Sequence, residues 1–158
     1  MHLACGYATE GQGVTPLAAG IGSDIILPCD VTDEASIDAV FETLEARWGK
    51  IDFVVHAIAY SDKEELKGKY VSTSAENFAQ TMMVSCYSFT AICRRAEALM
   101  PDGGSLITLS YAGSERVMPH YGLMGVAKAA PPPKEQEGEA AGDASEADNL
   151  GATLDTSA

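Results

Sequence analysis

Tyr121 and Lys128, in the stretch YGLMGVAK, are the residues whose types and spacing could do chemistry. At about 3.6 residues per turn, a separation of seven is two helical turns, so both side chains share one helix face. They are long enough to converge on one small molecule as a catalytic pair. Two unrelated surface residues are the alternative, because this spacing is common by chance.

Composition narrows the classes of function. The 158 residues carry a net charge of −13, which argues against nucleic-acid binding. They suffice for one domain, and no apolar run approaches the roughly 20 residues of a membrane span. Cysteines and histidines form no metal-ligand pattern, and the absence of CxxC spacing favours small core thiols in a reducing cytoplasm. The four cysteines are Cys5, Cys29, Cys86 and Cys93.

The elements that must position the pair follow from apolar runs. Runs at 25–29, 51–57 and 106–110 predict three buried strands. Between the first two, Thr32 or Asp33 can cap a helix that ends at Gly49, which is typical of a parallel βαβ unit. A capping box at 73–76 predicts a long helix after a loop at 61–72, and Pro119 is expected in the first turn of the Tyr/Lys helix. The class is α/β.

Three short stretches follow the predicted strands directly, at residues 30–31, 57–60 and 110–111. Ligands of open parallel sheets bind beyond the carboxyl ends of the strands, so this clustering raises the expectation that Tyr121 and Lys128 are functional. Each stretch also has a structural explanation: Asp30 could cap a helix, Ile58 could be core, and Tyr111 could pack at a strand end.

Residues 131–158 differ in character from the rest. They contain seven of the 23 acidic residues, no aromatic residue and little periodicity. Such a segment buries too little apolar surface to offset its ordering entropy, so we expect a disordered acidic tail. The expected domains are therefore a folded domain at 1–130 and this tail at 131–158.

Five motifs carry a family resemblance: CDVTDEASIDAVF, KIDFVVHAIAYSDKEEL, CYSFTAICRRAEALM, SLITLSYAGSERVMPHY and YGLMGVAK. Together they resemble the NADH-dependent enoyl-acyl-carrier-protein reductases of bacterial type II fatty-acid biosynthesis, which are divergent short-chain dehydrogenases/reductases. The resemblance runs from about residue 14 to residue 130. Two tyrosines ten apart, with a lysine seven further on, are specific to this branch. The resemblance implies a Rossmann-like, doubly wound parallel sheet. It also implies reduction of the 2,3 double bond of an enoyl thioester on acyl carrier protein.

The resemblance also implies site roles. Tyr121 would hold or protonate the enolate oxygen, because a neutral phenol donates a hydrogen bond to developing charge. Lys128 would bind the nicotinamide ribose, and Tyr111 would be the second active-site tyrosine. Ser61 would lie near the acyl thioester. Cofactor contacts are implied for the remaining residues: Asp30 and Val31 at the adenine, and Ala57, Ile58 and Ala59 along the dinucleotide.

Two parts of the family pattern are expected to be missing. The chain would begin near the second strand, at residues 3–7, and would lack the first βα unit and the C-terminal strands. In the family's strand order the first strand lies between the second and fourth, so its loss would open the middle of the sheet. Gly6, Gly11 and Gly13 are expected to form a turn, with too little chain before Asp30 for a helix and a strand.

These departures leave two functional alternatives open. The chain could be a catalytically inactive remnant, or an interaction module that associates with itself or with an intact reductase. Because reductases of this family are usually tetrameric, a homo-oligomer is a further expectation. No partner membrane, nucleic acid or metal is expected.

Overall fold

The computed structural model describes residues 4–7 and 13–130 of the chain. Its strands are β1 (Ala4–Tyr7), β2 (Ile25–Pro28), β3 (Phe53–His56) and β4 (Ser105–Thr108). The last three confirm the strands predicted from the apolar runs. β1 lies where the resemblance placed the family's second strand.

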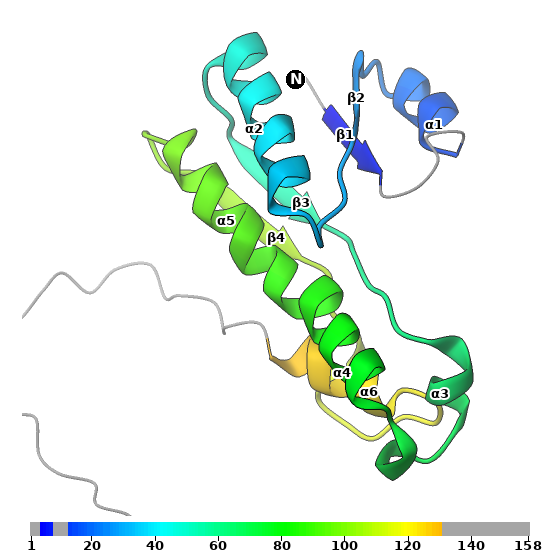
Figure 1. Cartoon of the computed structure of the whole chain (residues 1–158). Helices are drawn as coiled ribbons and strands as arrows, with labels where there is room; N and C mark the ends of the chain where they lie inside the picture. The colour runs from blue at the N-terminus through cyan, green and yellow to red at the C-terminus, as the bar shows by residue number, and fades with distance from the viewer. Residues whose placement is uncertain (1–3, 8–12, 131–158) are drawn as a thin grey trace, which may run out of the picture.

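The strands form two separate parallel sheets (Figure 1). β1 pairs with β2, with Ala4 opposite Ile25, and β3 pairs with β4, with Phe53 opposite Ser105. Within the described residues no strand bridges β1 and β3. The predicted parallel α/β architecture, and the predicted opening in the middle of the sheet, are therefore confirmed.

Helices α1 (Val14–Gly20) and α2 (Glu34–Trp48) flank β2 in sequence. Asp33 caps α2 by accepting a hydrogen bond from the Ala35 amide, and Gly49 ends it at a φ of 74°, as expected. The prediction that too little chain separates Gly13 from Asp30 was wrong. Because α1 has only seven residues, a helix and β2 both fit.

The segment predicted as a loop at 61–72 contains α3 (Lys63–Lys67) and a 3₁₀ turn, η1 (Tyr70–Ser72). Asp62 caps α3, since its side chain accepts from the amides of Glu64 and Glu65. This helix is one turn and a half long and has one apolar residue, Leu66, so hydrophobic periodicity could not reveal it.

The long helix predicted after residue 73 is built from α4 (Ala75–Met82), the π-helical turn η2 (Met83–Tyr87) and α5 (Ser88–Ala98). Its cap is Ser74 rather than Thr73: the Ser74 Oγ accepts from the Asn77 amide at 3.2 Å. That hydroxyl donates to Glu65 Oε1 at 2.7 Å. Glu65 from α3 therefore takes the place expected for Glu76.

The Tyr/Lys helix is α6 (Gly122–Ala129), preceded by the 3₁₀ turn η3 (Ala112–Ser114). Pro119 lies before the helix rather than in its first turn, and His120 follows it at a φ of 57°. The left-handed backbone conformation of His120 changes the direction of the chain, so α6 begins only after Tyr121.

The two core clusters join α2 to its neighbours. One cluster centres on Ile25, Leu44 and Leu99, and the other on Ile37, Val84 and Ile92. α2 and α5 thus pack together as one helical layer, while α1 lies across β1 and β2 from α2 (Figure 1). No helix of the described residues is long and apolar enough to cross a membrane.

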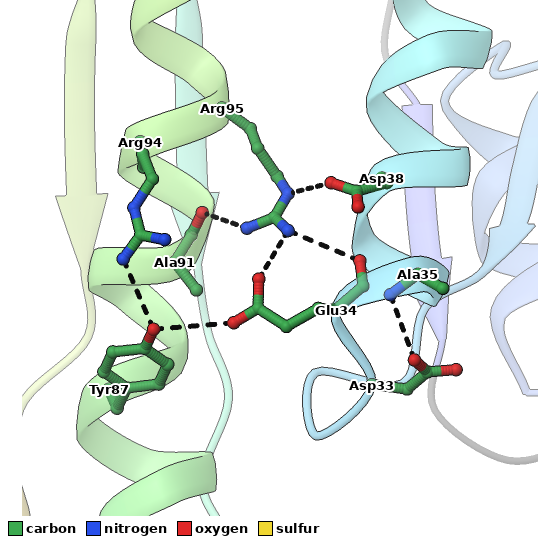
Figure 2. A network of polar contacts seen from close by, with 8 residues as sticks. All are labelled: Asp33, Glu34, Ala35, Asp38, Tyr87, Ala91, Arg94 and Arg95. Atoms are coloured by element: carbon green, nitrogen blue, oxygen red, sulfur yellow. Dashed lines mark hydrogen bonds and ion pairs between the residues drawn. The ribbon is translucent and has the colours of Figure 1, made fainter.

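A polar network joins α2 to α5 along the outer edge of this layer (Figure 2). The Arg95 guanidinium donates to Asp38 Oδ1 and Glu34 Oε2, both at 2.5 Å, and to the Ala91 carbonyl at 2.9 Å. The Arg95 side chain is 15% exposed. Arg94 makes one longer hydrogen bond, at 3.3 Å to the Tyr87 hydroxyl.

We expect Arg95→Met to lower the free energy of unfolding by about 1–2 kcal/mol, because charged hydrogen bonds between two helices are lost while the apolar stem is kept. Urea unfolding measures the effect. Arg94→Met is the matched control and is expected to change stability by less than about 0.5 kcal/mol. Equal losses in the two variants would show that this network does not hold α2 to α5.

Candidate active site

A cavity of about 1100 Å³ opens between the two sheets and reaches the carboxyl ends of the strands. Five residues predicted to bind the cofactor line it: Asp30, Val31, Ala57, Ile58 and Ala59. This is the position at which open α/β sheets bind ligands, where the connections diverge. The structure thus brings together residues that follow β2 and residues that follow β3 in the sequence.

Asp30 and Val31 have different environments. The exposed Asp30 carboxylate accepts from the Thr32 amide at 2.9 Å and from the Thr32 hydroxyl at 2.7 Å. These hydrogen bonds hold the pKa of Asp30 below its usual range. Val31 is buried in the cluster with Ile37. Asp30 is therefore presented as a fixed anion at the cavity rim, whereas Val31 anchors the turn behind it.

Lys128 connects α6 to the chain that follows β3. Its side chain is buried, and Nζ donates to the Ile58 carbonyl at 2.8 Å. Burial lowers the pKa of Lys128. An ammonium group has three donors, and among the described residues one of them is used in this way. The remaining donors suit ribose-type hydroxyls at the carboxyl end of β3.

Tyr121 and Tyr111 lie together, with ring centroids 4.9 Å apart and ring planes tilted by 59°. Burial raises the pKa of Tyr121, and Tyr111 adds to the effect. A raised pKa keeps the phenol neutral at physiological pH, as hydrogen-bond donation to an oxyanion requires. Of the three residues predicted to be catalytic, Tyr111 and Tyr121 therefore lie together, and Lys128 lies two turns further along α6.

Two glycines that we did not predict as site residues set the position of Tyr121. A Cβ on Gly113 would lie 2.1 Å from Cδ1 of the Tyr121 ring, and a Cβ on Gly125 would lie 2.7 Å from the Gly113 carbonyl oxygen. η3 and α6 can approach this closely only because both positions lack side chains. In the sequence, the signal that could have revealed them is that Gly113 and Gly125 lie on either side of Tyr121.

Ser61 lies in a buried polar network rather than free at the cavity. Its Oγ accepts from the Thr81 hydroxyl at 2.9 Å and donates to Asn77 Oδ1 at 3.4 Å. Asn77 Oδ1 also accepts from the Asp62 amide at 2.9 Å. These contacts tie the start of α3 to α4, so a substrate role for Ser61 remains a prediction.

His56, at the end of β3, is a buried residue that sequence reasoning missed. Its Nε2 lies 2.7 Å from Ser88 Oγ and its Nδ1 lies 3.1 Å from Thr108 Oγ1. Because the Ser88 hydroxyl donates to the Val84 carbonyl at 2.7 Å, it accepts from a protonated Nε2. The available signal was a polar residue within an apolar strand.

Burial, with a smaller contribution from the Lys128 charge, lowers the pKa of His56 to about 4. The unfolded chain binds this proton near pH 6.5, so stability is full above pH 6.5 and falls as pH drops toward 4. We expect a total loss of about 3 kcal/mol from this group. Urea unfolding between pH 7 and 4.5 measures the slope, which His56→Gln should flatten. An unchanged slope in His56→Gln would contradict the assignment.

The geometry fits a dinucleotide. The site offers a fixed carboxylate at Asp30, a buried ammonium at Lys128 and an apolar wall that includes Ile58. Among the described residues no group of three or more His, Cys, Asp or Glu side chains could hold a metal.

The chain is similar in sequence to known reductases. A sequence model described as Enoyl-(Acyl carrier protein) reductase matches residues 1–131. Among curated proteins, the chain is 59% identical over 131 residues to enoyl-[acyl-carrier-protein] reductase [NADH] 2 of Rhizobium meliloti (strain 1021), covering 82% of this chain and 49% of that protein. It is 63% identical over 117 residues to reductase [NADH] 1 of the same strain, covering 74% and 43%.

Solved structures agree. The reductase of Anaplasma phagocytophilum in complex with NAD superposes with a TM-score of 0.79 at 53% identity, covering 82% of this chain and 50% of that one. The Aquifex aeolicus VF5 reductase (NADH) gives a TM-score of 0.78 at 45% identity, covering 81% and 52%. The chain therefore spans about half the length of the relatives that it matches.

Proposed function

The chain belongs to the enoyl-acyl-carrier-protein reductase family, and from that premise we propose that it binds NADH and reduces the 2,3 double bond of enoyl thioesters on acyl carrier protein. The observation that carries this proposal is the cavity lined by Asp30, Ile58 and their neighbours, with Lys128 bound to the Ile58 carbonyl at 2.8 Å. We assign the reductase domain to residues 1–130 and place the activity in the cytoplasm.

NADH supplies the hydride in this chemistry. The chain's own residues bind and orient the cofactor and the substrate. Lys128 holds the ribose hydroxyls, and its positive charge stabilises the negative charge that develops nearby. Tyr121, kept neutral by its raised pKa, donates a hydrogen bond to the thioester oxygen where charge develops. Tyr111 packs against the Tyr121 ring and restricts its orientation.

Tyr121→Phe tests the assignment. It removes the hydroxyl but keeps the ring between Tyr111 and Gly113, so we expect crotonyl-thioester turnover to fall by about 10²–10³-fold. NADH affinity, measured by nicotinamide fluorescence, should stay within about twofold, because the lysine contact is intact. Tyr111→Phe is the matched control, with a smaller loss of turnover. Equal losses in both variants would contradict the role given to Tyr121.

The split sheet favours an interaction module as the second candidate. β1 and β3 are both unpaired on the sides facing the cavity, among the described residues. NADH binding without turnover in the unmodified chain would favour this candidate. Sedimentation with and without an intact reductase would show whether the chain associates with it or with itself.

A further inference from the structure

One carboxylate holds together the two ends of the chain segment between α3 and α4. Glu65, in α3, accepts from the Ser74 hydroxyl at 2.7 Å and from the Ser74 amide at 3.0 Å. Ser74 lies beyond η1 and directly before α4. The hydrogen bonds from Ser74 lower the pKa of Glu65, so the group is ionised at neutral pH. Residues 66–73 therefore form a loop that is closed by two charge-assisted hydrogen bonds.

The same carboxylate fixes the orientation of a buried amide. Asn77 is 6% exposed, and its Nδ2 donates to Glu65 Oε2 at 3.0 Å. Because the nitrogen faces Glu65, the Asn77 Oδ1 faces the other way and accepts from the Asp62 amide at 2.9 Å. Asp62 caps α3. Glu65 and Asn77 together thus tie the start and the middle of α3 to the first turn of α4.

The loop at 66–73 reaches the helix of the active site through Tyr70. A Cβ on Gly122, the first residue of α6, would lie 3.4 Å from Tyr70 Cδ2 and 3.5 Å from Tyr70 Cβ. The Tyr70 side chain therefore packs on the start of α6, which α3 also contacts. Gly122 directly follows Tyr121, whose ring packs tightly against Gly113. A displacement of the loop thus acts on the backbone next to the Tyr121 ring.

We propose that Glu65 is a positioning residue for Tyr121. By closing the loop at 66–73, the carboxylate holds Tyr70 against the start of α6 and thereby sets the position of the Tyr121 hydroxyl. The expected effect on turnover rests on the proposed reductase function, whereas the effect on the position of Tyr121 does not. Glu64 precedes Glu65 in α3 and makes a surface ion pair with Lys67 at 2.7 Å, so it provides a control of equal charge.

Trypsin measures how firmly the loop is held, because Lys67 and Lys69 are exposed within it. Glu65→Met and Glu64→Met are a matched pair, since each removes one carboxylate within three residues of Lys67. In Glu65→Met we expect cleavage after the two lysines to be about tenfold faster or more, and in Glu64→Met to change less than about twofold. Glu65→Gln should restore slow cleavage, because its amide still accepts from the Ser74 amide and can donate to the Ser74 hydroxyl.

Fluorine NMR of the full chain labelled with 3-fluorotyrosine follows Tyr121 itself, and Tyr121→Phe assigns its signal. We expect the Tyr121 signal to shift or broaden in Glu65→Met and to keep its position in Glu64→Met and Glu65→Gln. A merely structural role for Glu65 would lower stability without moving this signal in the folded chain. Tyr70→Ala keeps the Glu65 hydrogen bonds but removes the ring at Gly122, so it should also move the Tyr121 signal, even if Glu65→Met does not fold.

The kinetic effect should separate turnover from binding. With a crotonyl thioester, kcat of Glu65→Met is expected to fall by about tenfold, while KM and NADH affinity change less than about twofold. Absence of turnover in the unmodified chain would contradict the proposed function, but the trypsin and fluorine results would still decide the role of Glu65. Equal cleavage of the two methionine variants, no rescue by Glu65→Gln, or an unmoved Tyr121 signal in Tyr70→Ala would each overturn the proposal.

Discussion

Lys128→Met is expected to weaken NADH binding by at least tenfold, equivalent to about 1.4 kcal/mol or more. Methionine keeps the length and apolar stem of the side chain but removes the ammonium group. The Ile58 carbonyl loses its donor at 2.8 Å, and ribose hydroxyls lose theirs. Titration of the purified chain with NADH, followed by nicotinamide fluorescence, measures the change.

Lys67→Met is the matched control, because it also removes one positive charge. Lys67 is an exposed residue that pairs with Glu64 at 2.7 Å on α3, and surface pairs of this kind contribute little. We expect its NADH affinity to match that of the unmodified chain. If both variants lose affinity equally, net charge rather than the position of Lys128 controls binding. Undiminished binding in Lys128→Met would remove Lys128 from the site.

Gly125→Ala is expected to lower the free energy of unfolding by about 2 kcal/mol, despite the better helix propensity of alanine. The new Cβ would lie 2.7 Å from the Gly113 carbonyl oxygen, which is backbone and cannot rotate away. α6 must then move off η3, carrying Tyr121 and Lys128 with it. Turnover should therefore fall together with stability, which urea unfolding and the crotonyl-thioester assay measure.

Gly122→Ala separates this contact from helix propensity. Gly122 opens the same helix, and its Cβ would lie 3.4 Å from the Tyr70 ring, an ordinary contact. We expect no loss of stability, or a gain of about 0.5 kcal/mol. If Gly122→Ala and Gly125→Ala behave alike, the close approach of η3 to α6 is not what positions Tyr121.

Where local sequence patterns were strong, prediction succeeded. The apolar runs located β2, β3 and β4, and Asp33 and Gly49 bounded α2. Prediction failed where an element was short or its ends depended on distant residues. α3 has five residues, of which only Leu66 is apolar, and one apolar residue cannot show a hydrophobic period. Ser74 caps α4 by accepting from the Asn77 amide, and its hydroxyl is held there by a hydrogen bond that it donates to Glu65, nine positions earlier.

The sequence by itself determined the α/β class, the order of the elements and, through the family resemblance, the residues proposed as the site. These properties follow from local periodicity, caps and motif spacing, which neighbouring residues specify. Only the tertiary structure decided how those residues meet. The Lys128 contact with Ile58 spans 70 positions, the glycine packing at Tyr121 depends on the approach of η3 to α6, and the cavity depends on the separation of two sheets. Such features arise from packing between distant segments, so no local pattern encodes them.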